Sequence, residues 1–275
     1  MPTKKVILLT GASSGIGKAT ALQLIQEGHT VYGAARRIEK MQDLVDAGGH
    51  SLQMDVTKDT DMEKGIAQII EKEGRIDTLI NNAGYAIYGS VEETSIEDAR
   101  RQFEVNIFGL ARMTQLVLPH MREKSSGQII NVSSMGGRIY MPLGAWYHGT
   151  KHALEGWSDC LRLEVKPFGI DVVVIRPGAI ATEFGEVMLE PMLKRSGDGP
   201  YKKITQSMAK SIRDSYEKEN ASSPPSVIAN TISKAVNASK PKTRYTAGKL
   251  AKPLVFVRNY LGDRIYDWAI NSQFK

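Results

Sequence analysis

The chain has 275 residues, of which 41% are hydrophobic and 24% are charged. This composition is typical of a globular protein with a substantial core and argues against intrinsic disorder. The formal net charge of +6 is spread among acidic residues without a long lysine or arginine run, so we expect no nucleic-acid partner.

The chain contains a single cysteine, Cys160. It excludes an intrachain disulfide and a cysteine-based metal site, and we expect it to be buried as a small hydrophobic residue in a helix. Only four apolar residues follow Lys4 and Lys5, which is too short for a signal peptide. No run approaches the roughly 18 apolar residues of a membrane-spanning helix. We therefore expect a cytoplasmic protein with no transmembrane segment and no metal ion.

Six short apolar runs predict strands, and segments with helical spacing of apolar residues separate them. The runs cover residues 6–9, 30–35, 51–54, 78–81, 128–133 and 172–176. Gly28, Gly74 and Gly169 follow helical segments, where the C-terminal cap of a helix favours glycine. This alternation predicts an α/β fold of Rossmann type, with a doubly wound parallel sheet and helices on both faces in three layers.

The alternation stops after the sixth predicted strand. Residues 183–225 are polar, contain methionines and lack sustained apolar periodicity, so we expect an irregular loop that acts as a substrate-binding lid. A helical pattern over 227–236, a strand-like run over 243–246 and an amphipathic C-terminal tail over 250–275 follow. No linker separates these segments, so we expect residues 1–275 to form a single domain.

The first predicted strand runs into the sequence TGASSGIG, and this turn opens a helix. Unpaired N–H groups and the dipole at a helix start favour an anion. Glycines remove side chains where a pyrophosphate must approach the backbone, so the turn predicts a dinucleotide site. Ala19 stands where a P-loop requires a hydroxyl, which argues against that alternative. The residues assigned to the site here are Gly11, Ser13, Ser14, Gly15, Ile16 and Gly17.

Tyr147 and Lys151 are four residues apart in a predicted helix and so lie one turn apart on one face. An ammonium near a phenol favours the phenolate and lowers the pKa of the tyrosine from its reference near 10. The pair therefore predicts a general acid/base that works at neutral pH. Ser134 ends a predicted strand 13 positions before Tyr147, and we expect the two hydroxyls to hold one substrate carbonyl oxygen.

Together these motifs resemble the short-chain dehydrogenase/reductase family. They are TGASSGIG at 10–17, NNAG at 81–84, Asn106 in VNIFG, Ser134 thirteen residues before YHGTK at 147–151, and PGAIAT at 177–182. The similarity covers roughly residues 5–182. It implies a single Rossmann domain with about seven parallel strands and a nicotinamide cofactor.

The resemblance also implies a catalytic tetrad. Tyr147 would protonate a carbonyl as hydride arrives from the nicotinamide, and Ser134 would hold the carbonyl oxygen. Lys151 would bind the nicotinamide ribose and tune Tyr147, and Asn106 would position a water that connects Lys151 to bulk solvent. The further cofactor contacts that the resemblance implies are Asp55, Val56, Asn82, Ala83, Gly84, Tyr147, Lys151, Pro177, Gly178, Ile180 and Thr182.

The end of the second predicted strand distinguishes the two nicotinamide cofactors. NAD-binding folds place an acidic residue about 20 positions past the glycines to accept the ribose hydroxyls. Here that position is Ala35, and Arg36 and Arg37 follow it. A guanidinium fork suits a phosphate, so the sequence predicts NADP.

We therefore expect an NADPH-dependent oxidoreductase that transfers a hydride between nicotinamide and a carbonyl or secondary alcohol. The apolar residues of the lid suggest an apolar substrate, such as a steroid-, retinoid- or lipid-like ketone; they are Phe184, Met188, Leu189, Met192 and Leu193. The alternative is a catalytically idle NADP-binding regulator that senses redox state, against which the complete tetrad argues. Segments 106–122 and 147–165 resemble those used for subunit contacts in the family, which predicts a homodimer or homotetramer.

Overall fold

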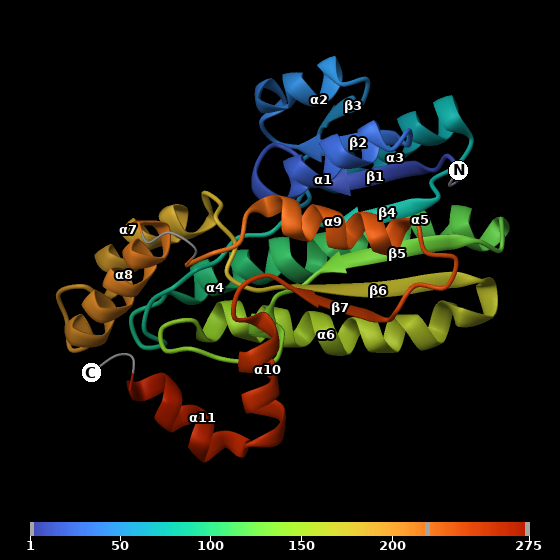
Figure 1. Cartoon of the computed structure of the whole chain (residues 1–275). Coiled ribbons are helices and arrows are strands. Elements are labelled where there is room, and N and C mark those ends of the chain that lie inside the picture. Colours follow the sequence, from blue (N-terminus) through green and yellow to red (C-terminus); the bar gives the residue numbers. More distant parts are fainter. Residues whose placement is uncertain (1–2, 218–220, 273–275) are drawn as a thin grey trace.

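The computed structural model describes residues 3–217 and 221–272. Seven parallel strands form one sheet in the order β3-β2-β1-β4-β5-β6-β7 (Figure 1). The strands are β1 (Val6–Thr10), β2 (Thr30–Ala35), β3 (His50–Gln53), β4 (Thr78–Asn81), β5 (Gly127–Val132), β6 (Ile170–Pro177) and β7 (Arg244–Ala247). The predicted doubly wound parallel sheet is confirmed, and each predicted strand lies within two residues of an observed one.

The sheet is wound outward from β1 in both directions. β1 is buried over its whole length, which explains why its sequence is a continuous apolar run rather than an alternating one. The chain first builds β2 and β3 on one side of β1 and then returns to place β4 on the other side. Ligands of such folds bind outside the carboxyl ends of the strands at this reversal of strand order.

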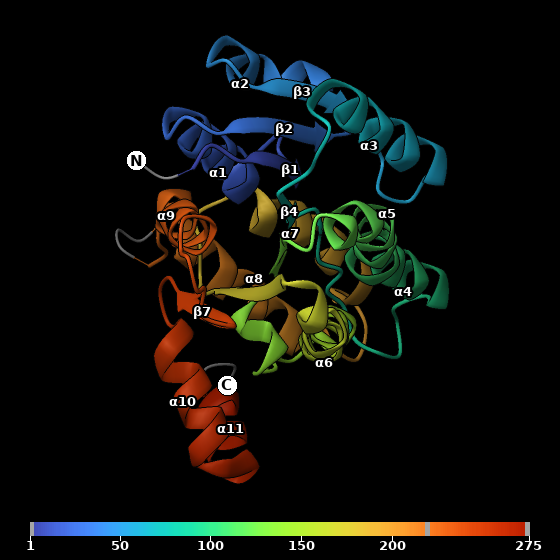
Figure 2. The ribbon, with the colours of Figure 1, turned by 90° about the vertical axis from the view of Figure 1, so that its right-hand side faces the viewer.

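Helices cover both faces of the sheet and form the predicted three layers (Figure 2). One face packs against α3 (Asp59–Glu73), α5 (Leu110–Glu123) and α6 (Ala145–Val165). The other face packs against α1 (Gly15–Gln26), α2 (Gln42–Asp46) and α9 (Pro225–Val236). The first core includes Leu8, Met62, Val117, Ile129 and Leu161, and the second includes Ile7, Leu9, Leu24, Leu44 and Ile232.

α4 (Ile96–Phe103) continues into α5 through a π-helical segment, Glu104–Gly109. A π segment inserts an extra residue into a helix and is frequent at functional sites. Asn106 lies within it. Three short 3₁₀ turns complete this part of the fold, at Ile38–Met41, Met135–Gly137 and Lys166–Phe168.

Four further helices lie beyond the carboxyl ends of the strands: α7 (Phe184–Ser196), α8 (Lys202–Glu217), α10 (Ala251–Tyr260) and α11 (Gly262–Asn271). The prediction of an irregular segment over 183–225 is therefore wrong. Each helix buries few apolar positions, such as Met208 and Ile212 in α8, and Pro191 lies inside α7. The apolar spacing was too sparse to show two helices separated by the Gly197 turn.

Two other expectations bear on the surface. Cys160 is exposed on α6, so its expected burial is wrong. Within the two described ranges, no helix has the length and apolar character needed to cross a membrane.

Candidate active site

A cavity of ≈ 670 Å³ lies at the carboxyl ends of the strands, where β1 and β4 meet. Every residue that the sequence assigned to cofactor binding lines it, and so does Ser134. Asn106 does not line it. The cavity thus gathers residues from the ends of β1, β2, β4, β5 and β6, together with α6 and the start of α7.

The glycine turn needs its glycines for two different reasons. Gly11 has a φ of +72° and Gly15 a φ of +53°, a region that disfavours a side chain. At Gly17 a Cβ would lie 2.1 Å from the Gly11 carbonyl oxygen. The turn therefore presents bare backbone to the cavity at the start of α1.

Asn82 fastens this turn to the end of β4. Its amide Nδ2 donates to the carbonyl oxygens of Thr10, at 3.0 Å, and Gly11, at 3.2 Å. In return the hydroxyl oxygen of Thr10 accepts from the backbone N–H groups of Asn82 and Ala83, both at 3.1 Å. Both amide protons of Asn82 are thus used within the protein, so its side chain shapes the turn.

The start of α1 and the end of β2 suit a phosphate-bearing ligand. The first turn of α1 has no acidic residue, and the Ser14 side chain makes no capping hydrogen bond, so the helix N–H groups are not neutralised by the protein. Arg36 and Arg37 line the cavity at the end of β2, and both are exposed. A glycine cradle, a helix start and two guanidiniums together fit a dinucleotide.

Asp55 follows β3 and lines the same part of the cavity. Burial would raise the pKa of its carboxyl group, but hydrogen bonds from the Thr57 backbone and hydroxyl and the charge of Arg36 outweigh this and lower the pKa. One carboxylate oxygen accepts both Thr57 hydrogen bonds, at 3.0 and 2.8 Å. Asp55 is thus held as a carboxylate near Arg36.

Tyr147 is buried near the start of α6 and has two aromatic rings near it. The ring centroids of Tyr88 and Phe184 lie 6.1 and 5.7 Å from its own. Burial raises the pKa of Tyr147, and a hydrogen bond with Ser134 partly opposes that rise. The expectation of a lowered pKa is therefore wrong for the protein by itself, because desolvation by burial outweighs the hydrogen bond with Ser134. The expected proximity of Ser134 and Tyr147 is observed.

Lys151 lies one turn further along α6 and is also buried. Its Nζ donates to the Val132 carbonyl oxygen at the end of β5, at 2.9 Å. Burial lowers the pKa of Lys151 to about 8, and the negative charge of Glu155 opposes this shift. Lys151 therefore carries a readily lost proton in the cavity wall.

Asn106 is held behind the cavity by Tyr85 and α6. Its Oδ1 accepts from the Tyr85 N–H at 3.2 Å, and its Nδ2 donates to the Tyr85 carbonyl oxygen at 3.0 Å and to the Thr150 hydroxyl at 3.1 Å. A Cβ on Gly84 would lie 3.2 Å from the Asn106 Oδ1 and 3.9 Å from the Lys151 Nζ. Asn106 therefore lies near Lys151, with its own amide engaged by the loop after β4.

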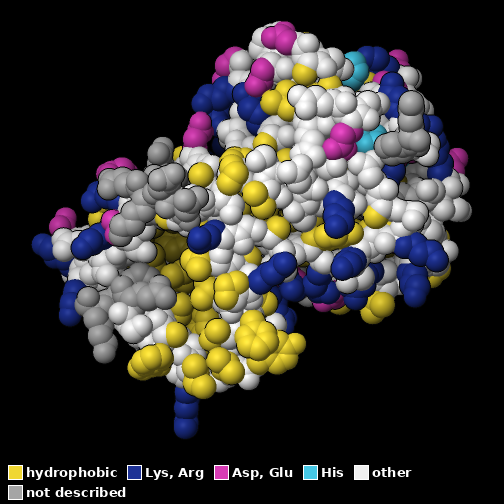
Figure 3. Space-filling view, in the orientation of Figure 1, with side chains coloured by type: hydrophobic (Ala, Val, Ile, Leu, Met, Phe, Trp, Pro, Cys, Tyr) yellow, Lys and Arg dark blue, Asp and Glu magenta, His cyan; other side chains and the backbone are white. Residues whose placement is uncertain are grey.

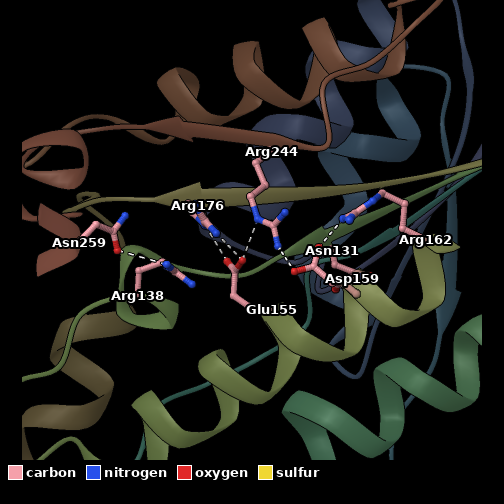
Figure 4. Close-up of polar contacts among 9 residues, drawn as sticks. Asn131, Arg138, Glu155, Asp159, Arg162, Arg176, Arg244 and Asn259 are labelled. Atoms are coloured by element: carbon pink, nitrogen blue, oxygen red, sulfur yellow. Dashed lines mark hydrogen bonds and ion pairs between the residues drawn. The ribbon is translucent and has the colours of Figure 1, made fainter. Parts of the chain in front are cut away.

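Sequence reasoning missed an ionic network beneath the catalytic helix (Figure 4). Glu155, one turn after Lys151, accepts two hydrogen bonds from Arg176 and one from Arg244. Arg244 also pairs with Asp159, which in turn pairs with Arg162. Glu155 follows Tyr147 and Lys151 at intervals of four residues, a helical spacing that points to one shared face. Its partners, Arg176 on β6 and Arg244 on β7, lie far from it in the sequence, so no local pattern predicted these ion pairs.

His148 is a second residue that sequence reasoning left without a role. The Gly136 carbonyl can only accept and the Met141 N–H can only donate, at 3.0 and 3.1 Å, so Nδ1 carries the proton and Nε2 is the acceptor. Burial lowers the pKa of His148 to about 4, which keeps the ring neutral. His148 thus fixes the segment between Ser134 and Tyr147, and its adjacency to Tyr147 was the only available signal.

Comparison with known proteins assigns the family. The family model for short chain dehydrogenase matches residues 5–191. The chain belongs to the short-chain dehydrogenase/reductase family. Members of this family are oxidoreductases that bind a nicotinamide cofactor and act on small molecules.

Relatives of this short-chain dehydrogenase match it along nearly its whole length. It is 35% identical over 271 residues to the 3-ketodihydrosphingosine reductase of Bacteroides thetaiotaomicron, covering 97% of this chain and 96% of that one. It is 33% identical over 264 residues to the NADPH-dependent 3-dehydrocapnine reductase of Ornithobacterium rhinotracheale, covering 90% and 89%. A short-chain dehydrogenase structure from Streptomyces avermitilis superposes with a TM-score of 0.80 at 32% identity, over 98% of both chains.

Proposed function

We propose that this protein is an NADPH-dependent reductase of ketones with a large apolar part. The observation that carries the proposal is the joint placement of Ser134, Tyr147 and Lys151 in one cavity with the glycine turn. When bound, the nicotinamide group supplies or takes the hydride. The protein itself must hold the carbonyl and deliver the proton.

Tyr147 is the proton donor in this proposal. Its raised pKa keeps the phenol protonated at neutral pH, which suits reduction, where the carbonyl oxygen takes up a proton. The Ser134 hydroxyl lies within hydrogen-bonding distance of Tyr147 and can hold the same oxygen. Lys151, with a pKa of about 8, would bind the ribose and favour the phenolate left after proton transfer.

The choice of NADP rests on the end of β2. Arg36 and Arg37 line the cavity there, and no carboxylate stands at Ala35 to hold the free ribose hydroxyls of NAD. A guanidinium gives two parallel hydrogen bonds to a phosphate. The NADPH dependence in the name of the O. rhinotracheale relative supports the same choice.

The apolar substrate class rests on the wall next to Tyr147. Side chains from α7 and from the segment before α6 line it, namely Ile139, Met141, Phe184, Val187 and Met188. We propose that α7 and α8 form a lid over this wall and that the substrate is a lipid-like ketone. The name 3-ketodihydrosphingosine reductase of the B. thetaiotaomicron relative supports a ketone of this class.

We also propose a homodimer or homotetramer that uses α5 and α6. The outer side of α6 presents small residues at helical spacing, including Gly149, Ala153 and Gly156, and ends in the exposed Leu163. Small residues let two helices approach closely. Light scattering of the purified protein tests this assembly.

The test of the proposed function is Tyr147→Phe, compared with Tyr88→Phe. Both substitutions remove one buried phenol hydroxyl from the same cavity wall. We expect Tyr147→Phe to lower kcat for ketone reduction by about 10²–10⁴-fold, because general acid catalysis contributes that much. Tyr88→Phe should change it less than threefold, and both variants should bind NADPH as the wild type does, measured by cofactor fluorescence.

Wild-type protein that binds NADPH but reduces no ketone in a panel of chain lengths would instead indicate an idle NADP-binding regulator. Equal turnover by Tyr147→Phe and the wild type would reject Tyr147 as the donor.

A further inference from the structure

The outer side of α10 and α11 carries five large apolar side chains. They are Phe256, Tyr260, Leu261, Ile265 and Trp268, and we call them the hairpin face. Their exposure is high, reaching 72% for Trp268 and 73% for Tyr260. Figure 3 shows hydrophobic side chains gathered over these helices at the lower edge of the molecule. Apolar side chains gathered in this way mark an interaction surface.

The hairpin formed by α10 and α11 is apolar on its inner side as well. Leu254, Tyr266 and Ile270 pack into the cluster that includes the cavity-lining residues Ile139 and Met141. A surface helix of a globular protein normally exposes a polar face opposite its buried one. Here both sides are apolar, so the outer side requires a partner of its own.

The hairpin is fastened firmly to the segment before α6. The Tyr266 hydroxyl donates to the Tyr140 carbonyl oxygen at 3.0 Å, and the Tyr140 hydroxyl donates to Asp267 at 2.7 Å. Arg138 donates to the Asn259 side-chain oxygen at 3.2 Å (Figure 4). These contacts hold the hairpin face in a fixed orientation next to the cavity.

Basic side chains lie on α10 and α11 and just before α10. Lys249, Lys252 and Arg264 are exposed, and none of them has an ion-pair partner within residues 3–217 and 221–272. The nearby Asp263 is paired with Arg258. Asp267 on α11 accepts from the Tyr140 hydroxyl and is outnumbered by these three cations, so the face combines exposed aromatic rings with a net positive charge.

We propose that the hairpin face docks the protein on an anionic lipid bilayer. Exposed Trp, Tyr and Phe beside Lys and Arg are the residues that bind the headgroup region of a membrane. A second copy of the chain suits the face less well, because a two-fold contact places identical patches together and would oppose like charges. Each helix has 10 residues and is about 15 Å long, so the hairpin lies in the interface.

Docking by this face would bring the cavity wall at Ile139 and Met141 close to the bilayer surface. A lipid-like ketone would then pass from the membrane to Tyr147 beside the hairpin. This use of the surface rests on the proposed function, whereas docking itself does not.

Sedimentation with vesicles tests docking directly. We expect wild-type protein to bind vesicles that contain both phosphatidylglycerol and phosphatidylcholine more tightly than vesicles of phosphatidylcholine alone. Tyr260→Ser/Trp268→Ser should lower the partition coefficient at least about tenfold, because it removes most of the exposed aromatic area. Lys249→Gln/Lys252→Gln should lower it about fivefold for each lysine, since one charge near an anionic surface contributes about that much.

The control is Val45→Ser, which removes an exposed apolar side chain from α2, outside the proposed subunit interface, and should leave vesicle binding unchanged. Tyr147→Phe should bind vesicles as the wild type does, which separates docking from catalysis. Failure of the wild type to bind anionic vesicles would overturn the proposal, as would unchanged binding by the aromatic variant. A solution dimer that only Tyr260→Ser/Trp268→Ser dissociates, without vesicle binding, would assign the face to a second copy instead.

Discussion

The guanidinium of Arg176, on β6, is bound side-on by the carboxylate of Glu155, on α6. Arg176 Nε lies 2.8 Å from Glu155 Oε1, and Arg176 Nη2 lies 2.6 Å from Oε2. Both side chains are nearly buried, with exposures of 11% and 6%. Such a bidentate pair joins the sheet to the helix that carries Tyr147 and Lys151.

Glu155→Gln is expected to destabilise the fold by about 3–5 kcal/mol, because it leaves the buried Arg176 without its opposite charge. Urea unfolding of the variant measures this. The double variant Glu155→Leu/Arg176→Met should recover most of the loss, since replacing both ions by apolar groups removes the unpaired charge. A double variant as unstable as Glu155→Gln would show that the network around Arg244, and not this pair, dominates.

Lys151→Met should stabilise the protein by about 1–3 kcal/mol at pH 7 while abolishing reduction. The folded pKa of Lys151 is about 8, below its ordinary 10.5, so folding disfavours the charged form. Below pH 8 Lys151 is charged in both the folded and the unfolded wild type, so the full cost of burying its charge lowers the stability. Between pH 8 and 10.5 the folded state alone loses the proton, so wild-type stability rises relative to the variant.

Unfolding both proteins in urea at pH 7, 9 and 10.5 measures this difference. The advantage of Lys151→Met should shrink as the pH rises. A difference independent of pH would contradict the lowered pKa of Lys151.

Arg36→Asp should weaken NADPH binding by about 10- to 150-fold, since a hydrogen bond to a charged group contributes about 1.5–3 kcal/mol. The new carboxylate can accept the ribose hydroxyls of NADH, so the affinity for NADH should rise. Dissociation constants for both cofactors decide the outcome. Lys64→Asp makes the same charge change on the exposed side of α3, away from the cavity, and should alter neither constant more than slightly.

Efficiency should rise with ketone chain length until the apolar wall is filled, by about fourfold per methylene at about 0.8 kcal/mol each. Phe184→Ala should flatten this dependence, because Phe184 lines the cavity beside Tyr147. Values of kcat/KM across a homologous series provide the measurement. Phe168→Ala, a similarly exposed phenylalanine in the turn before β6, should keep the wild-type slope. Equal efficiency at all lengths in the wild type would contradict the apolar wall.

Hydrogen exchange tests the lid. We expect amides of α7 and α8 to gain protection when NADPH and a long ketone bind, since closure would exclude water from the reaction. The salt bridge between Arg195 and Asp98, at 2.9 Å, anchors the C-terminal end of α7, so the gain should be largest near Phe184. Full protection of the amides near Phe184 in the protein without ligands would argue against a moving lid.

The sequence by itself determined the strands, the glycine turn and those cavity residues that it assigned to cofactor binding. A buried parallel strand is a short apolar run, and the turn after it needs glycine at positions such as Gly11, so both leave local signals. The carboxyl ends of parallel strands meet at one edge of the sheet, so residues as far apart as Gly11 and Pro177 could be placed together without coordinates.

Only the tertiary structure decided what depends on packing between distant segments. Burial raises the pKa of Tyr147, where the sequence had predicted a lowered value. Desolvation depends on packed neighbours such as Phe184, which the spacing between Tyr147 and Lys151 does not reveal. The partners of Glu155 come from strands 21 and 89 residues away, a separation that leaves no periodic trace. The outer face of α10 and α11 likewise became visible only once the inner face was seen to be buried.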